Sequence, residues 1–392
     1  MNEPQAFSNG RICAYGVMRK HWPRVDPYLD MALDEVLATT EETIEADGSY
    51  LEGPSYMAYG LGSAGQALCW YARARGFPVE DIMPGCLSQT ADFAEAVHST
   101  DRDQDVIPIC DATDQLPTPF LTMMAALNPD SRWVQIYRES SGNSPGVPSN
   151  VLSIRFADWV PEQAPPPRPF VRLEEMGVVA SNRALGDHRV KLLLMGNKAG
   201  AGHTHEDKGS FVLEFGGDTF AMDPGKCSYG DPLMGQLKQC QRHNMLVPYG
   251  TTERPRPECP LHADVKPRAT GDYTSFRAGI DATPGWDGYY ARWERDWESP
   301  RPEVLRITDR WELENGKGVE FCWNTRLPVR VDDGKVHIEG ENGRVVLAVP
   351  DRTTVRVDEL RLIEPEGVQR RIAFRRNKRS SQMCVEARLE VK

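Results

Sequence analysis

Two histidines one residue apart, His203 and His205, open the run His-Thr-His-Glu-Asp-Lys-Gly-Ser-Phe, which continues into an apolar stretch. Half of the eight histidines of the chain lie between His188 and His243. Neutral imidazole can both ligate a metal and exchange protons near neutral pH. Alternate residues of a strand share a face, so His203 and His205 are expected to point the same way. This segment is therefore predicted to carry the chemistry of the protein.

Later residues could complete a metal site with His205. Asp223 lies beyond a predicted hairpin whose turn is Gly216-Gly217, and His243 follows it. Zinc accepts imidazole and carboxylate ligands in tetrahedral sites, and three protein ligands leave one position open. A sheet can bring such residues together from consecutive β elements. His205, Asp223 and His243 are therefore candidate ligands, although their spacing fits equally well with unrelated polar residues in turns.

The elements before these residues are predicted to be antiparallel helices with short loops. Residues 27–46 place their apolar side chains at the spacing of one helix face. Residues 56–75 predict a second helix, in which three glycines suggest close packing. Shorter helices are expected at residues 89–98 and 119–127.

The composition changes beyond residue 130 or so. Residues 161–169 contain a Pro-Pro-Pro run that suits a connector, and strand signals then continue almost to the end. We therefore expect a partial helical domain over residues 1–150, a Pro-rich linker over 151–169 and a β domain over 170–392. The clearest strand signals fall at residues 190–195, 210–215, 304–313, 318–323, 343–349 and 354–362.

Composition and charge argue against several classes of protein. A chain of 392 residues favours two domains. The net charge of −11 argues against a nucleic-acid partner, since neutralising phosphates requires a basic surface. A polyanionic substrate would need a locally basic cleft. The nine cysteines form no CxxC pairs, so no zinc ribbon or disulfide framework is indicated. No apolar segment approaches the roughly 18 residues of a membrane span, so no membrane partner is expected.

Two motifs together resemble the heparinase II/III-like family of polysaccharide lyases. One is the run opened by His203, followed by Asp-Pro-Gly at 223–225, Tyr229 and Arg-His-Asn at 242–244. The other is Asp-Gly-Ser-Tyr-Leu-Glu-Gly-Pro-Ser-Tyr-Met-Ala-Tyr at 47–59. The resemblance covers nearly the whole chain. It implies a multidomain α+β fold, in which an incomplete (α/α) toroid of antiparallel helices precedes a large antiparallel β-sandwich.

The resemblance also implies an activity: β-elimination at the bond 4-linked to a uronic acid of an anionic polysaccharide. A base must take the C5 proton, an acid must protonate the departing O4, and the carboxylate must be neutralised. Tyr56 matches the family's catalytic tyrosine, expected to protonate the leaving oxygen, and His203 matches its catalytic histidine, which could act as base or polarise the carboxylate. Tyr229 could support substrate or proton transfer, or could only pack. His205, Asp223 and His243 match the family's metal ligands, which implies a mainly structural zinc.

In the family, an Asn-Asn or Asn-His motif lies before the catalytic tyrosine in the sequence. Counting back the same number of residues from Tyr56 in this chain leads to Asn2. Asn2 matches that motif only loosely, so its catalytic role stays open, and the chain resembles an N-terminally truncated family member. Tyr59, one turn after Tyr56, is an alternative to it. Glu206 and Asp207 are interpreted as surface or supporting groups rather than ligands. Lys198, Lys208, Arg183 and Arg242 could pair with substrate carboxylates or sulfates, or could equally be solvated surface charges.

Two further classes of function stay open on sequence grounds. The chain could be a noncatalytic, zinc-stabilised carbohydrate-binding or structural remnant of such a lyase. It could also be a metal-dependent hydrolase that uses the same cluster to activate water. The resemblance implies a periplasmic or extracellular location, although no signal peptide is visible. The sequence does not indicate which uronan is the substrate, whether a glycosaminoglycan or alginate. It does not indicate the oligomeric state either.

Overall fold

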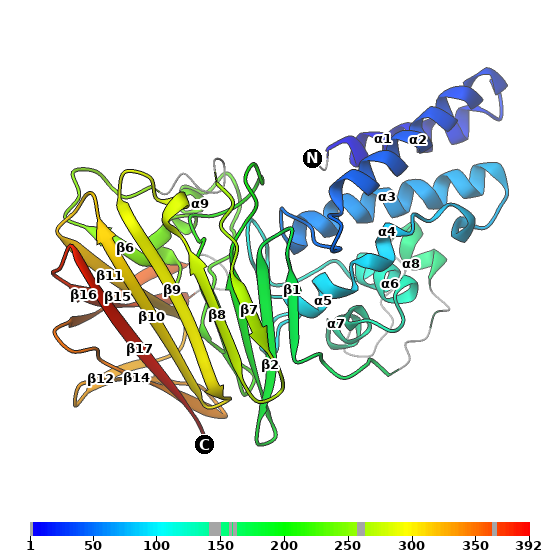
Figure 1. Cartoon of the computed structure of the whole chain (residues 1–392). Helices are drawn as coiled ribbons and strands as arrows, with labels where there is room; N and C mark the ends of the chain where they lie inside the picture. The colour runs from blue at the N-terminus through cyan, green and yellow to red at the C-terminus, as the bar shows by residue number, and fades with distance from the viewer. Residues whose placement is uncertain (1–2, 141–149, 157–158, 160–162, 257–262, 363–366) are drawn as a thin grey trace.

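The computed structural model describes residues 3–140, 150–156, 159, 163–256, 263–362 and 367–392. A helical part at one end lies beside a β part that contains the C-terminus (Figure 1). This order confirms the predicted α+β fold, with antiparallel helices followed by large antiparallel sheets. None of the helices in these residues is both long and apolar enough to span a membrane.

The helical part is built on three longer helices that pack against one another. In α2, the apolar face expected from sequence is buried, with Leu29 and Val36 fully inaccessible. Gly65 of α3 lets α6 approach closely, since a Cβ there would lie 2.3 Å from the sulfur of Met123. The helices are α1 (Glu3–Met18), α2 (Asp26–Thr43), α3 (Pro54–Arg75), α4 (Cys86–Gln89), α5 (Ala91–Val97), α6 (Thr118–Leu127), α7 (Arg132–Ser140) and α8 (Val151–Arg155).

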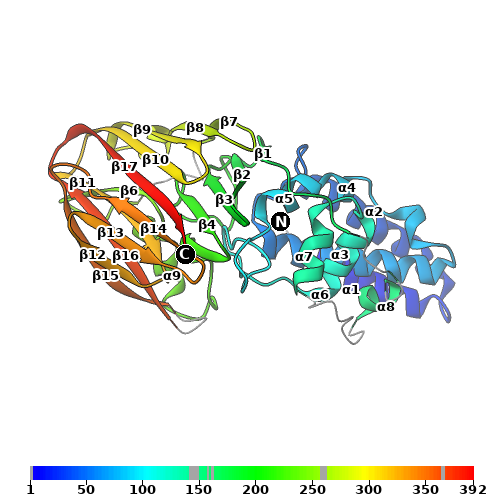
Figure 2. The ribbon, with the colours of Figure 1, turned by 90° about the horizontal axis from the view of Figure 1, so that it is seen from below.

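Three antiparallel sheets form the β part, and the view from below shows them as layers (Figure 2). The sheet nearest the helices has the order β1-β2-β3-β4-β5. Its strands are β1 (Phe170–Leu173), β2 (Val178–Leu185), β3 (His188–Met195), β4 (Phe211–Phe215) and β5 (Asp218–Ala221).

The other two sheets have the orders β12-β13-β14-β17-β10-β9-β8-β7 and β15-β16-β11-β6. Trp293, Trp297 and Trp323 are fully buried in the core of the β part, as expected if they pack rather than present flat surfaces to sugars. The strands are β6 (Leu246–Tyr249), β7 (Arg268–Gly271), β8 (Phe276–Asp281), β9 (Tyr290–Arg301), β10 (Val304–Leu313), β11 (Gly318–Thr325), β12 (Val329–Asp332), β13 (Lys335–Glu339), β14 (Gly343–Ala348), β15 (Thr354–Leu362), β16 (Gly367–Arg376) and β17 (Ser380–Val391).

Some elements carried no clear sequence signal. α1 and α7 were not singled out, and α8 lies within the stretch 151–169 expected to be a linker. The side chain of Asn150 caps α8 by accepting hydrogen bonds from the N–H groups of Leu152 and Ser153, which explains how a single turn forms beside proline-rich sequence.

Buried polar contacts join the helical part to the first sheet. Lys191 of β3 donates hydrogen bonds to the main-chain carbonyls of Glu95 and His98, at 2.9 and 2.5 Å. The carboxylate of Glu214 in β4 accepts one from Ser99, at 2.6 Å. Because all these groups are shielded from water, the contacts fix how α5 and the loop after it meet strands β3 and β4.

Candidate active site and metal centre

His203 and His205 lie in the loop between β3 and β4, not on a strand, so the expectation that they share a strand face is wrong. His203 has φ +54°, a left-handed conformation that non-glycine residues rarely adopt. The turn at this residue breaks the strand alternation. Both imidazoles nevertheless reach the same carboxylate, that of Asp111.

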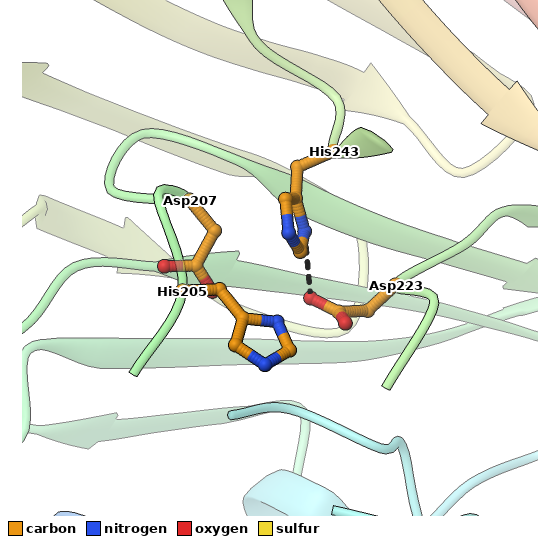
Figure 3. Close-up of side chains that lie close together, drawn as sticks. All are labelled: His205, Asp207, Asp223 and His243. Atoms are coloured by element: carbon orange, nitrogen blue, oxygen red, sulfur yellow. Dashed lines mark hydrogen bonds and ion pairs between the residues drawn. The ribbon is translucent and has the colours of Figure 1, made fainter. Parts of the chain in front are cut away.

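Four buried side chains meet at one point in the β part (Figure 3). The ligand atoms of His205, Asp207, Asp223 and His243 all lie within 4.8 Å of one another. The three candidate ligands predicted from sequence are thus brought together. Asp207 joins them, and the interpretation of it as a surface group is wrong, since it is only 1% exposed.

The donor set fits a metal ion. The Nδ1 atom of His205 and the Oδ2 atom of Asp207 are buried, and neither has a hydrogen-bond partner in the described residues. Buried polar atoms normally form hydrogen bonds, so two neighbouring ligand atoms without partners indicate that a positive ion belongs between them. Asp223 Oδ2 lies 3.2 Å from His243 Nδ1. Imidazole nitrogens and carboxylate oxygens are ligands that zinc accepts, so the cluster could hold such an ion.

Electrostatics within the cluster favours a charged carboxylate. Burial alone would raise the pKa of Asp223, but the neighbouring positive charge and hydrogen bond of His243 lower it. The main-chain N–H of Gly225 adds a further hydrogen bond to Asp223 Oδ1, at 2.9 Å. Asp223 is therefore held in the ionised form that a metal ligand requires.

Asp111 connects this cluster to the rest of the site. It is fully buried in the loop between α5 and α6. Its Oδ1 atom lies 3.0 Å from His205 Nε2. Its Oδ2 atom lies 3.0 Å from His203 Nδ1, and it accepts hydrogen bonds from the Tyr229 hydroxyl and Lys238 Nζ, both at 2.7 Å. Burial would raise the pKa of Asp111, but hydrogen bonds from His205, Lys238 and Tyr229 outweigh it and lower the pKa.

The two sequence motifs do not include Asp111. Nothing in its local sequence marks it, because the residues that it bonds lie far along the chain. Its position depends on a loop in which Cys110 adopts φ +62° and the main-chain N–H of Asp111 donates to the carbonyl of His203, at 2.9 Å. An isolated aspartate in a turn gives no sequence signal of this role.

Tyr56, His203 and Tyr229 form a compact group around Asp111. The Tyr56 ring stacks on the His203 imidazole with centroids 3.8 Å apart. The Tyr56 and Tyr229 hydroxyls lie 2.7 Å apart, and Tyr229 OH lies 3.1 Å from His203 Nδ1. Tyr59, the alternative to Tyr56, is 53% exposed and takes part in none of these contacts within the described residues. The structure thus brings together three of the candidate catalytic residues implied by the resemblance.

The hydrogen bonds fix where the protons lie. Tyr229 has one hydroxyl proton and donates it to Asp111, so Tyr56 must donate to Tyr229. Burial and the hydrogen bonds to Tyr56 and Asp111 raise the pKa of Tyr229. Burial is also the main reason that the pKa of Tyr56 is raised, although the bond with Tyr229 opposes it. Both phenols therefore keep their protons at neutral pH.

A glycine positions Tyr56. Gly53 precedes α3 with φ +86°, and a Cβ there would lie 2.7 Å from the carbonyl oxygen of Ile109. Ser55, in the first turn of α3, accepts a hydrogen bond from the N–H of Thr113, at 2.9 Å. The start of the helix is thus fastened to the loop that carries Asp111, which sets Tyr56 beside His203.

The four cations suggested as substrate partners all have partners within the protein, so their contact with a substrate stays a prediction. Lys198 pairs with Glu45 and Glu175. The other three bond to groups of their own surroundings: Lys208 to the His205 carbonyl and Asp207, Arg183 to Ser299, and Arg242 to Gln369 and the Arg361 carbonyl. The cations at the site are instead Lys226 and Lys238, which sequence reasoning missed.

Asn2, the remaining candidate catalytic residue, lies outside the described residues.

Asn244, next to His243, is fully buried. Its side chain donates to the carbonyls of Phe211 and Met222, at 2.6 and 3.1 Å, so it ties together the segments that carry the cluster.

Comparisons with known proteins agree with this architecture. A family model described as heparinase II/III-like, C-terminal, matches residues 165–391. A heparan sulfate lyase HepC mutant from Pedobacter heparinus shares the fold with a TM-score of 0.68 at 14% identity, over 96% of this chain and 58% of that one. A structure named heparinase III gives 0.68 at 14% identity, over 98% of this chain and 60% of that one. The chain thus spans about three fifths of the length of these structures. No curated protein matches the sequence.

Proposed function

The chain belongs to the heparinase II/III-like family, and from this premise we propose that it is a polysaccharide lyase that cleaves a uronic-acid-containing glycan by β-elimination. The observation that carries the proposal is the shared carboxylate of Asp111. It contacts two candidate proton-transfer residues, His203 and Tyr229, and a candidate metal ligand, His205.

His203 is the proposed base. When Nδ1–H donates to the Asp111 carboxylate, the proton is held on that nitrogen and Nε2 carries the free lone pair. The side chain is one-third exposed, which leaves it accessible to a sugar. In the proposed step Nε2 takes the C5 proton of the uronate.

Tyr56 is the proposed acid. Its phenol is protonated at neutral pH and stacks on His203, so donor and acceptor can act on adjacent atoms of one sugar. The electrons of the C5–H bond form the C4–C5 double bond, the C4–O4 bond breaks, and O4 takes the proton of Tyr56. The proton on His203 then restores the phenol, directly or through water. Tyr229 positions both groups through its hydrogen bonds.

We propose that His205, Asp207, Asp223 and His243 hold a zinc ion. Four protein ligands would close a tetrahedral site, which is typical of structural zinc, whereas catalytic sites keep an open position. When bound, the ion would supply positive charge that orders the loop carrying His203. The contact between Asp111 and His205 is the kind of carboxylate–histidine pair that orients metal-bound imidazoles.

The substrate class follows from the same premise: an anionic polysaccharide such as a glycosaminoglycan or alginate. A periplasmic or extracellular site of action would suit that substrate and is part of the proposal.

An ultraviolet assay over a panel of uronans tests the function. Elimination creates a conjugated double bond that absorbs in the ultraviolet, whereas hydrolysis does not. We expect at least one polymer to give rising absorbance and His203→Ala to abolish it. Unchanged activity in that variant would remove His203 from the mechanism. Cleavage without absorbance would favour a hydrolase, and binding without cleavage would favour a noncatalytic protein.

A further inference from the structure

A cavity of about 340 Å³ opens between the loop that carries Asp111 and the Asp223-Pro224-Gly225 turn, and one of its lining residues, Lys226, lies near the rings of Tyr56 and Tyr229. This volume lies within the range of small-ligand pockets. It is lined by Pro108, Ala112, Thr113, Asp114, Pro224, Lys226 and Arg326.

Two of the lining residues are cations without partners. The Lys226 ammonium makes no hydrogen bond or ion pair in the described residues, and it lies 5.2 Å from the Tyr56 ring centre and 5.6 Å from that of Tyr229. The Arg326 Nε atom is buried and also lacks a partner there. Asp114 is the one acidic residue of the lining, so the two cations outnumber it.

The fold holds Lys226 at this place. Gly225 adopts φ +59°, and a Cβ there would lie 2.6 Å from the carbonyl oxygen of Ala112. The main-chain N–H of Lys226 donates to that same oxygen, at 2.9 Å. Lys226 is thus fixed next to the loop that carries Asp111, although its ammonium pairs with no acidic group in the described residues.

Burying positive charges without partners costs free energy, which the binding of a ligand of opposite charge would offset. Burial lowers the pKa of both Lys226 and Arg326, which records the cost of shielding each charge from water. In a chain of net charge −11, cations that face a cavity without acidic partners indicate an anionic ligand.

We propose that this cavity binds the carboxylate of the uronate being cleaved, with Lys226 as its direct contact and Arg326 as a second positive charge. The inference rests on the proposed lyase function. The carboxylate is bonded to C5, so it must lie close to any base that takes the C5 proton. Lys238 is also near, but its charge is already paired with Asp111. Lys226 would neutralise the carboxylate and stabilise the extra negative charge that develops on it as the proton leaves.

The test is a binding experiment on the intact chain with hexasaccharides of hyaluronan, heparosan and alginate, which carry carboxylates as their only charged groups. Each is compared with its carboxyl-reduced form. For the wild type we expect at least one native hexasaccharide to bind about tenfold or more tighter than its reduced form. In Lys226→Met that difference should largely disappear, and in Lys226→Arg it should persist. Lys335→Met, which removes an exposed charge on β13, should behave as the wild type. Equal melting temperatures exclude a folding effect.

Three outcomes would overturn the proposal: binding of none of the native hexasaccharides, a wild type indifferent to carboxyl reduction, or a Lys226→Met variant that still distinguishes the two forms. The outcome is separable from that of the lyase proposal. Lys226-dependent binding without an ultraviolet product would leave the cavity assignment standing and reject the lyase. An ultraviolet product formed equally well by Lys226→Met would support the lyase and reject the cavity assignment.

Discussion

At the scale of single residues, the site is organised by a carboxylate that the sequence does not mark. His203, His205 and Tyr229 are predictable because they fall in a motif. Asp111 contacts all three, yet it lies in a separate loop, and only the packing of the two parts brings it there. Asp207 illustrates the same limit. Next to a lysine and a glutamate it resembles a surface residue, and only its burial identifies it as a possible ligand.

The variant Asp111→Asn tests this organisation. It keeps the size of the side chain but removes the charge that holds the Nδ1 proton of His203 and supports His205. We expect kcat on the best uronan to fall by about 10²–10⁴-fold, the usual contribution of general acid–base catalysis. Metal affinity should fall by about 10–100-fold. Asp103→Asn, in an exposed turn, is the control. A kcat within a few-fold of the wild type would show that Asp111 does not organise the site.

At the scale of elements, the sequence predicts regular segments better than the loops that hold the site. The apolar periodicity of α2 and the hairpin of β4 and β5 are visible in the sequence, since local chemistry determines them. At His203, by contrast, strand alternation fails because φ turns positive. Long-range contacts impose that conformation, and no local pattern encodes it.

The variant Gly53→Ala tests whether Gly53 is needed for the packing of the start of α3 against the loop that carries Asp111. The substitution imposes a strained φ and a clash with the Ile109 carbonyl, so we expect a loss of about 1–3 kcal/mol in the free energy of unfolding. Gly10→Ala is the matched control: Gly10 lies within α1 with open space around it, and alanine there should stabilise by about 0.5–1 kcal/mol. Denaturant unfolding measures both. Similar effects of the two substitutions would disprove the role given to Gly53.

Acid should destabilise the fold around His98, the residue after α5, which contacts Glu139 of α7. Burial lowers the pKa of His98 from 6.5 to about 4, although its hydrogen bond with Glu139 opposes the shift. The unfolded chain therefore takes up the proton first, so stability is lost as the pH falls from 6.5 towards 4. The loss is on the order of 3 kcal/mol over this window.

Urea unfolding of wild type and His98→Gln across this pH range isolates the contribution. Glutamine can keep a hydrogen bond to Glu139 but does not titrate. We expect the stability of the variant to depend less steeply on pH. Parallel curves for the two proteins would mean that His98 is not the titrating group.

At the scale of the whole molecule, the site exists only where the two parts meet. Tyr56 and Asp111 come from the helical part, and His203 and Tyr229 come from the β part. Helices followed by antiparallel sheets could be predicted from the change in sequence periodicity. The position of one part on the other could not, because it depends on buried contacts such as those of Lys191 and Glu214, whose polar side chains suggest a surface location.

Metal removal should destabilise the chain as a whole if the ion is structural. We expect metal analysis to find about one zinc ion per chain. Chelation should lower the melting temperature, since an ion present at a hundredfold excess over its Kd contributes about 2.7 kcal/mol. Asp207→Asn should weaken zinc binding although the family resemblance does not place this residue among the metal ligands. An unchanged melting temperature after complete zinc removal would contradict the structural role.

The mass spectrum of the cleavage product tests the central claim most directly. Elimination across C4 and C5 leaves a non-reducing end that lacks one molecule of water compared with the product of hydrolysis. We predict that the chain converts a uronan to oligosaccharides with this unsaturated end, and that Tyr56→Phe forms none at a measurable rate. Products that retain the full mass of a hydrolysed end would contradict the account.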